Sequence, residues 1–152
     1  MAVEEHGYSV YIYQARGTKA VSLDSHLGTR RPMHATATGK SMLSHLDTDA
    51  IDDIIDRHGL ATYTANTIDE RDSLLTELTK IREQGYAIDD GELIDGMRAV
   101  AAPIVPDGSK EVVGSLAVTG PRNHITDSRL RTEMPETVME IARTAGIEFT
   151  YS

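Results

Sequence analysis

Apolar positions along the chain follow two periodicities, one typical of strands and the other typical of helices. Alternating or clustered apolar residues predict strands at 8–16, 19–23, 97–105 and 112–119, and the start of another strand at 86–88. From 35 to 85, and again from 126 onward, apolar residues recur at helical spacing. Because the strands lie toward both ends of the chain and most helices lie between them, we expect one mostly antiparallel sheet with helices packed on it, an α+β domain.

The first two predicted helices follow a loop at 26–32 that is rich in glycine and arginine. Residues 35–46 predict one helix, because their apolar side chains fall on one face. A second, shorter helix is expected to begin at a cap formed by Asp47 or Thr48 and to end at Gly59.

Capping residues and turns also mark the later elements. The motif Thr-Ile-Asp-Glu at 67–70 predicts a capping box at the start of a third helix, and Gly85 is expected to be its C-terminal cap. An Asp-Gly pair at 107–108 predicts a hairpin between the last two strands. The final helix is expected to begin near Thr126, with Pro135 either bending it or marking a new N-terminal turn.

The length of 152 residues predicts a single domain, residues 1–152, that buries enough apolar surface to fold without disulfides or metal ions. The chain contains no cysteine, which excludes disulfides, thiolate metal sites and cysteine nucleophiles. No apolar run approaches the ~20 residues that span a bilayer, and the N-terminus lacks the pattern of a signal peptide. We therefore expect a cytoplasmic protein that does not contact a membrane.

The formal net charge of -9 repels nucleic-acid phosphates, so this chain alone is expected to bind DNA poorly. Lysine is scarce while aspartate and threonine are plentiful. That balance resembles the surfaces of salt-adapted haloarchaeal proteins, and an ordinary acidic surface of a mesophilic protein is the alternative.

The segment from Gly85 to Pro103 joins an acidic turn to an apolar run with small side chains. Asp89, Asp90 and Glu92 place three carboxylates in the turn. Such a segment suits a strand that forms one wall of a concave ligand site. It also suits an ordinary hairpin between two core strands, and these residues alone leave both interpretations open.

Residues 34–41, His-Ala-Thr-Ala-Thr-Gly-Lys-Ser, have some features of a phosphate-binding P-loop. The motif requires glycine at its first position, where this chain has His34, and no buried strand precedes it, so nucleotide binding is disfavoured. A helix start at 36–40 would offer free N–H groups to a carboxylate. On its own, that segment favours the alternative of a plain helix N-terminus capped by Thr36 or Thr38.

The sequence shows no clear catalytic or metal-binding pattern. The histidines are scattered without the spacing of a metal site, and no G-x-S-x-G motif is present. Asp89 and Asp90 could serve as an acid–base pair, but neighbours on an extended strand point to opposite faces, and a solvated acidic turn explains them equally well. We expect no metal, no cofactor and no enzymatic activity.

Three blocks together resemble the C-terminal effector-binding domain of IclR-family transcription regulators. They are HATATGKSMLSHL, TIDERDSLLTELTKIREQGYAIDDGELIDGMRAVAAPI and VVGSLAVTGPRNHITDSRL, which begin at residues 34, 67 and 112. The resemblance covers nearly the whole chain and implies a GAF-like α+β fold that senses a ligand. It also implies a small organic acid as effector, a homodimer or tetramer, and DNA binding only through an N-terminal winged helix-turn-helix, which this chain lacks.

The resemblance also implies a ligand-binding site, which we carry over motif by motif. Its members are small residues beside the Gly-Lys pair, the first aspartate of the acidic turn, and small or hydroxyl residues on two later strands. In this chain they are Ala37, Thr38, Gly39, Asp89, Ala99, Ala117 and Thr119. Relatives often have larger or polar residues at the positions of Ala99 and Ala117, so we predict a roomier, less polar pocket suited to a larger or aromatic acid.

The expected chemistry of this site is recognition of a carboxylate. The effector carboxylate is expected near the N–H groups of 36–40 and the Thr119 hydroxyl, while Asp89 bonds a ligand hydroxyl. One alternative is a structural dimerisation domain with a vestigial pocket, which the small side chains would suit if neighbours filled the space. A GAF-like enzyme is the other alternative; those that reduce methionine sulfoxide use cysteine, which is absent here.

Overall fold

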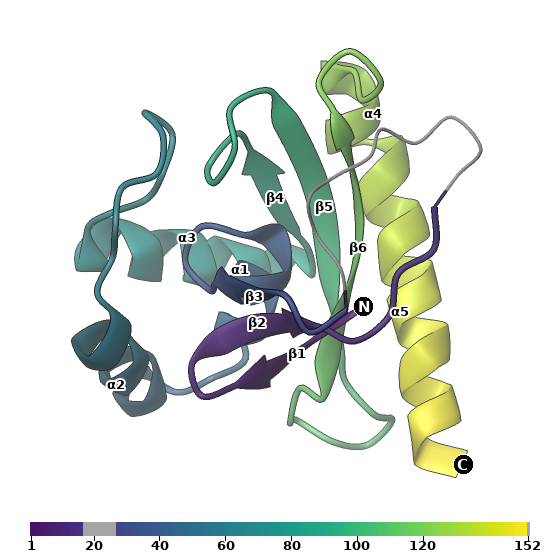
Figure 1. Ribbon diagram of the computed structural model, residues 1–152. Coiled ribbons are helices and arrows are strands. Elements are labelled where there is room, and N and C mark those ends of the chain that lie inside the picture. Colours follow the sequence, from purple (N-terminus) through teal and green to yellow (C-terminus); the bar gives the residue numbers. More distant parts are fainter. Residues whose placement is uncertain (17–26, 152) are drawn as a thin grey trace.

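One antiparallel sheet runs through the protein, and helices cover both of its faces (Figure 1). The computed structural model describes residues 1–16 and 27–151, so the strand expected at 19–23 lies outside the described residues. The strands are β1 (Ala2–Glu5), β2 (Tyr8–Tyr11), β3 (Arg30–Pro32), β4 (Ala87–Asp90), β5 (Met97–Ile104) and β6 (Gly114–Pro121). The helices are α1 (Ala37–Leu43), α2 (Thr48–His58), α3 (Arg71–Gln84), α4 (Asp127–Arg131) and α5 (Glu133–Tyr151).

The six strands follow the order β3-β2-β1-β6-β5-β4, and every neighbouring pair is antiparallel. The N-terminal hairpin β1–β2 joins the later strands through β6, where Ala2 lies opposite Ser115. The predicted hairpin between β5 and β6 is present, with Gly108 in its connection at a φ of 75°. This topology confirms the expected α+β, GAF-like fold with an antiparallel sheet.

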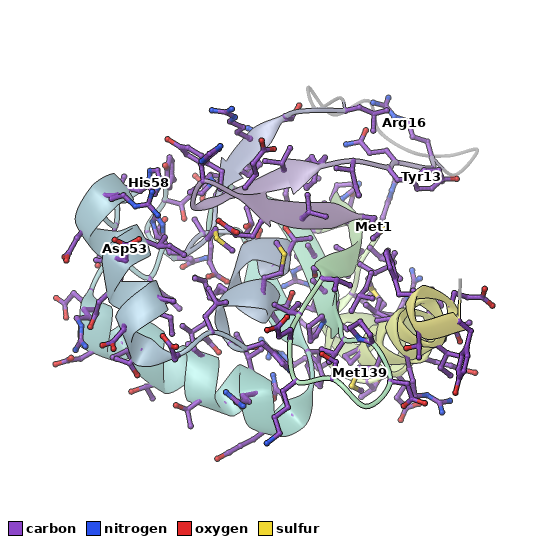
Figure 2. All side chains as sticks on the ribbon, turned by 90° about the horizontal axis from the view of Figure 1, so that it is seen from below. Met1, Tyr13, Arg16, Asp53, His58 and Met139 are labelled. Carbon is purple, nitrogen blue, oxygen red and sulfur yellow. The ribbon has the colours of Figure 1, made fainter. Side chains whose placement is uncertain are left out.

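Alternating side chains on β5 divide the core into two clusters. Ala99 and Ala101 belong to the cluster that α1 and α3 complete on one face, and Val100 belongs to the cluster beneath α5 on the other. Seen from below, α2, which carries His58, and α5, which carries Met139, lie on opposite sides of the molecule (Figure 2). The small alanines of β5 allow α1 to pack close to the sheet.

Two short strands depart from the expectation based on sequence. β1 has one fully buried side chain, that of Ala2, so alternation could not reveal it, and it forms because β2 and β6 both pair with it. β3 occupies Arg30–Pro32, within the predicted loop; its place at the sheet edge tolerates two arginines and a proline. β2 ends at Tyr11, well short of the predicted end at Arg16.

The first two helices are marked by the capping residues that the sequence suggested. α1 has only seven residues, fewer than expected, and begins after Thr36, whose hydroxyl accepts the N–H of Gly39 at 3.1 Å. Asp47, the first of the two candidate caps, accepts the N–H of Ala50 at the start of α2. Gly59 ends α2 as predicted.

The capping box predicted at the start of α3 is wrong. The N-cap residue is Glu70, and its side chain makes no capping hydrogen bond. Thr67 is buried in the preceding loop instead, where its hydroxyl accepts two backbone N–H groups of that loop and donates to the carbonyl of Glu92. The C-terminal cap is as predicted, because Gly85 adopts the left-handed conformation with a φ of 91°.

The predicted final helix is divided into two. α4 begins after its cap, Thr126, and α5 begins at Glu133. Pro135 lies in the first turn of α5, where a missing N–H breaks no bond within the helix, so it marks a new N-terminal turn. In the described part of the chain, no helix combines the length and the apolar character needed to cross a membrane.

Candidate ligand-binding site

Four of the predicted ligand-binding residues lie on neighbouring strands of one sheet face. β4 continues from its predicted start at 86–88 through Asp90, so Asp89 lies within a strand. Asp89 is opposite Ala99 on β5, and Ala99 is opposite Thr119 on β6. Ala117 lies two residues before Thr119 and therefore points to the same side. This face is the one that packs against α1.

The other three predicted residues lie on α1, and all three are buried: Ala37, Thr38 and Gly39. The hydroxyl of Thr38 is hydrogen-bonded to that of Ser9 on β2 at 2.8 Å. A methyl group on Gly39 would lie 2.3 Å from backbone atoms of Met33, so only glycine fits this close approach. The sheet residues and the helix residues thus lie on facing surfaces, and the contacts of Thr38 and Gly39 are with the protein itself.

Exposure differs among the four residues on the sheet. Ala99 is buried, with 6% of its surface exposed, and forms part of the core. Asp89 and Ala117 are half-buried, and Thr119 is exposed. The row therefore passes from the core to the surface and leaves the Thr119 side chain accessible.

Asp89 has the most strongly perturbed carboxyl of the described site. Burial raises its pKa to about 7; a hydrogen bond from the Glu92 N–H at 2.8 Å opposes the rise, and the nearby Glu92 carboxylate adds to it. Near neutral pH the carboxyl is therefore present in both its protonated and its ionised form. It can donate a hydrogen bond in the first form and only accept in the second.

The lysine of the P-loop-like motif belongs to a buried ion pair that sequence reasoning missed. The Lys40 ammonium donates to the Ile88 carbonyl at 2.7 Å and to Glu92 Oε2 at 3.0 Å. Glu92 Oε1 lies 2.8 Å from the ammonium but makes no hydrogen bond, and burial raises the pKa of this carboxyl despite Lys40. Because the ammonium is engaged inside the protein, it is not placed to bind a phosphate.

Buried serines tie α1 to the sheet. The hydroxyls of Ser41 and Ser115 are hydrogen-bonded at 2.6 Å, and Ser115 also donates to the carbonyl of Ala102. Ser44 is close to the ring of His45, at 3.2 Å, but donates to the carbonyl of Ser41. Among the residues that the structure describes, no group of three His, Asp or Glu side chains could hold a metal ion.

Tyr11 and Arg31 form a second pair that the sequence did not indicate, because Arg31 was placed in a loop. Both side chains are half-buried. Burial raises the pKa of the Tyr11 phenol; the charge of Arg31 and a hydrogen bond from its guanidinium oppose that rise, whereas the charge of Asp89 adds to it. Tyr11 therefore lies near both a cation and the perturbed aspartate.

Asp90 points to the opposite face from Asp89, as expected for neighbours on a strand. Its carboxylate accepts a hydrogen bond from Arg98 at 2.9 Å and lies 3.3 Å from Arg122. Arg98 also donates to Asp127 at the start of α4. Burial alone would raise the pKa of Asp90, but these two arginines hold it below its usual value. The two aspartates consequently do not form an acid–base pair.

None of the seven predicted residues lines either of two cavities found among the described residues. One, of about 120 Å³, lies between β2, α2 and the loop after α2, where His34, His58 and Tyr63 contribute to its lining. The other, of about 260 Å³, lies between Gly85 and Met139 beneath α5. The predicted site is therefore separate from both of these cavities.

Comparison with known proteins connects this arrangement with transcription regulators. Residues 1–146 match the family described as "Bacterial transcriptional regulator IclR C-terminal". The chain is 32% identical over 145 residues to the "Probable HTH-type transcriptional regulator ArcR" of Halobacterium salinarum, covering 93% of this chain and 55% of that protein. It is 32% identical over 141 residues to the "Acetate operon repressor" of Salmonella typhimurium, covering 93% and 51%. The chain thus spans about half the length of the curated relatives it matches.

Solved structures show the same architecture. The C-terminal domain of the transcriptional regulator KdgR from E. coli superposes with a TM-score of 0.82 at 28% identity, covering 99% of this chain and 85% of that one. The inducer-binding domain of a double mutant of PobR from Acinetobacter, in complex with 3-hydroxybenzoic acid, gives a TM-score of 0.84 at 25% identity, covering 95% and 85%.

Proposed function

The chain belongs to the IclR family of transcription regulators, which are not enzymes, and from that premise we propose that it senses a small organic acid for a DNA-binding regulator. The acid binds against the face formed by β4, β5 and β6. Its binding controls an N-terminal winged helix-turn-helix that lies outside these 152 residues. The PobR inducer-binding domain, whose solved structure contains 3-hydroxybenzoic acid, supports an acid as ligand.

The observation that carries this proposal is the row Asp89–Ala99–Thr119 across three strands. Asp89 supplies a carboxyl whose pKa is raised to about 7, Ala99 a small buried apolar side chain, and Thr119 an exposed hydroxyl. The carboxyl pairs with a ligand hydroxyl in either protonation state, and the Thr119 hydroxyl adds a donor or acceptor. Because Ala99 and Ala117 are small, the site suits a larger or aromatic acid. A six-atom acid would bind with at most about -9 kcal/mol, in the micromolar to submicromolar range.

The structural alternative, a dimerisation domain with a vestigial pocket, is favoured by one observation. Ala37, Thr38 and Gly39 are buried, and neither of the two cavities given above is lined by a predicted site residue. For either function, we also propose that residues 1–152 form one domain that assembles as a homodimer or tetramer, and that the protein is cytoplasmic and salt-adapted. Relatedness to a Halobacterium protein supports salt adaptation, and sedimentation over a range of KCl concentrations tests both the assembly and its salt dependence.

The direct test is calorimetry of the purified chain against a panel of aliphatic and aromatic hydroxy acids and keto acids. We expect at least one acid to bind, and Asp89→Ala to change its affinity about tenfold, the effect of losing one hydrogen bond to a charged group. Asp95→Ala removes the same charge from an exposed position in the adjacent turn and should leave binding unchanged. If no acid of the panel binds, the sensing role is wrong and the dimerisation domain is favoured.

A further inference from the structure

Arg31 has no acidic partner among the described residues, although the chain carries a net charge of -9. Its half-buried guanidinium donates a hydrogen bond to the Tyr11 hydroxyl, which is neutral in the folded protein near pH 7. A guanidinium has five N–H donors arranged to bind a carboxylate through two of them. Among the described residues, the guanidinium of Arg31 makes no other side-chain hydrogen bond, so several of its N–H donors face no described partner.

Strand register places Arg31 on the same sheet face as the candidate site. Arg31 on β3 is opposite Ser9 on β2, and the Ser9 hydroxyl is bonded to Thr38 of α1. Tyr11 lies two residues beyond Ser9 on the same face, at the diagonal position that long side chains reach across a strand pair. The effect of Asp89 on Tyr11 shows that these two side chains are also close. Tyr11 also packs against the core cluster that contains Ala99, so Arg31, Tyr11 and Asp89 share the sheet face on which α1 packs.

Arg30 provides a built-in comparison on the same short strand. It is opposite Val10, and so points to the other face of the sheet, where its guanidinium lies 5.6 Å from the centre of the Tyr8 ring. Arg30 is exposed, whereas Arg31 is half-buried. The two residues have the same charge and differ in the face they occupy.

The N-terminus of α1 is a weaker place for the carboxylate than the sequence suggested. α1 has only seven residues, and Thr36 already accepts the N–H of Gly39. Arg31 supplies a full positive charge on the same face, whereas a helix end supplies only a partial one. The cation therefore provides the better anchor for an anion.

We propose that Arg31 binds the carboxylate of the effector, that Tyr11 holds the guanidinium in place, and that Asp89 bonds a hydroxyl at the other end of the ligand. This inference rests on the sensing role proposed above. It names the ligand class as a monocarboxylic acid with a separate hydroxyl group. A dicarboxylic acid is disfavoured, because its second carboxylate would meet the ionised form of Asp89.

The test compares acids with their uncharged amides on the complete chain. Calorimetry at pH 7 measures 3-hydroxybenzoate against 3-hydroxybenzamide and isophthalate, and lactate against lactamide and malonate. We expect the wild type to bind an acid ten- to a hundredfold more tightly than its amide, the effect of charge-assisted hydrogen bonds. Arg31→Gln should lose most of that difference, Arg31→Lys should keep part of it, and Arg30→Gln should behave as the wild type.

Each outcome decides between the inference and the role on which it rests. If the wild type binds an acid and its amide equally, or if Arg31→Gln still prefers the acid as strongly as the wild type, Arg31 is not the anchor, although the domain remains a sensor. If none of these hydroxy acids binds the wild type, the ligand class is wrong; the wider panel then shows whether sensing fails too. Should Arg31→Gln unfold, the acid–amide comparison on the wild type and on Arg31→Lys still decides.

Discussion

Replacement of Asp89 by asparagine should stabilise the protein relative to the wild type, and this difference should grow as the pH rises. The carboxyl is more easily protonated in the folded chain, where its pKa is about 7, than in the unfolded chain, where it is near 3.8. The folded state therefore holds more protons than the unfolded state between these values, so its free energy of unfolding falls as the pH increases through that range. Below about pH 4 the Asp89 carboxyl does not lower the free energy of unfolding, and above about pH 7 it lowers it by the full amount.

The magnitude follows from the two pKa values. A pKa difference from 3.8 to about 7 corresponds to a loss of about 4 kcal/mol of unfolding free energy at high pH. This value is an upper bound, because Glu92 and Lys40 adjust when Asp89 ionises. The amide oxygen of asparagine can still accept the Glu92 N–H, now 2.8 Å from the carboxylate, so the local hydrogen bond is kept. Asp89→Asn should thus be more stable than the wild type by about 2–4 kcal/mol at pH 8, and by nearly nothing at pH 4.

Urea unfolding followed by circular dichroism, at pH values from 4 to 8.5, measures this difference directly. Asp95→Asn, at an exposed position in the adjacent turn, controls for the change in net charge. If the stability of Asp89→Asn and of the wild type changes in parallel across this pH range, burial does not destabilise the ionised carboxylate of Asp89.

Two further substitutions test the contacts that hold α1. Lys40→Met leaves Glu92 as an unpaired buried carboxylate, so unfolding should become about 3–5 kcal/mol easier, and adding Glu92→Leu should restore much of the loss; a double variant no more stable than Lys40→Met contradicts this. Gly39→Ala places a methyl group 2.3 Å from the backbone of Met33 and should cost at least about 2–3 kcal/mol in thermal or urea unfolding. Gly108→Ala meets no atom within 4 Å and should cost only about 1 kcal/mol, for its left-handed backbone, so equal effects of the two alanines would contradict the steric argument.

Local signals predicted the parts of the fold that depend on local contacts. Asp47 and Gly85 mark helix ends by bonds to residues a few positions away, so their roles could be inferred from sequence. The capping box at Thr67 fits the same kind of pattern but fails, because the hydroxyl instead bonds to a carbonyl 25 residues away. β3 around Arg31 was missed for a related reason: an edge strand of arginines forms only because β2 is beside it.

In the candidate site too, local patterns predicted some features, and contacts between residues distant in sequence were missed. Placement of Asp89 and Ala99 on one face follows from strand alternation once their strands are known, and the resemblance to known regulators supplied their role, which remains a prediction. The ion pair between Lys40 and Glu92 joins residues 52 positions apart, and no spacing rule reveals it. Arg31 was missed because its segment was interpreted as a loop, which hid the face to which its side chain points.

The attachments of α1 limit how this domain can acquire new ligand preferences during evolution. The helix is fixed by the close approach of Gly39 to Met33, by the hydroxyl pair of Ser41 and Ser115, and by the ammonium of Lys40. Moving it to enlarge the site would break several buried contacts at once, whereas a change on a strand alters one side chain. Variation in ligand size and charge is therefore expected to accumulate at strand positions such as Ala99, one substitution at a time.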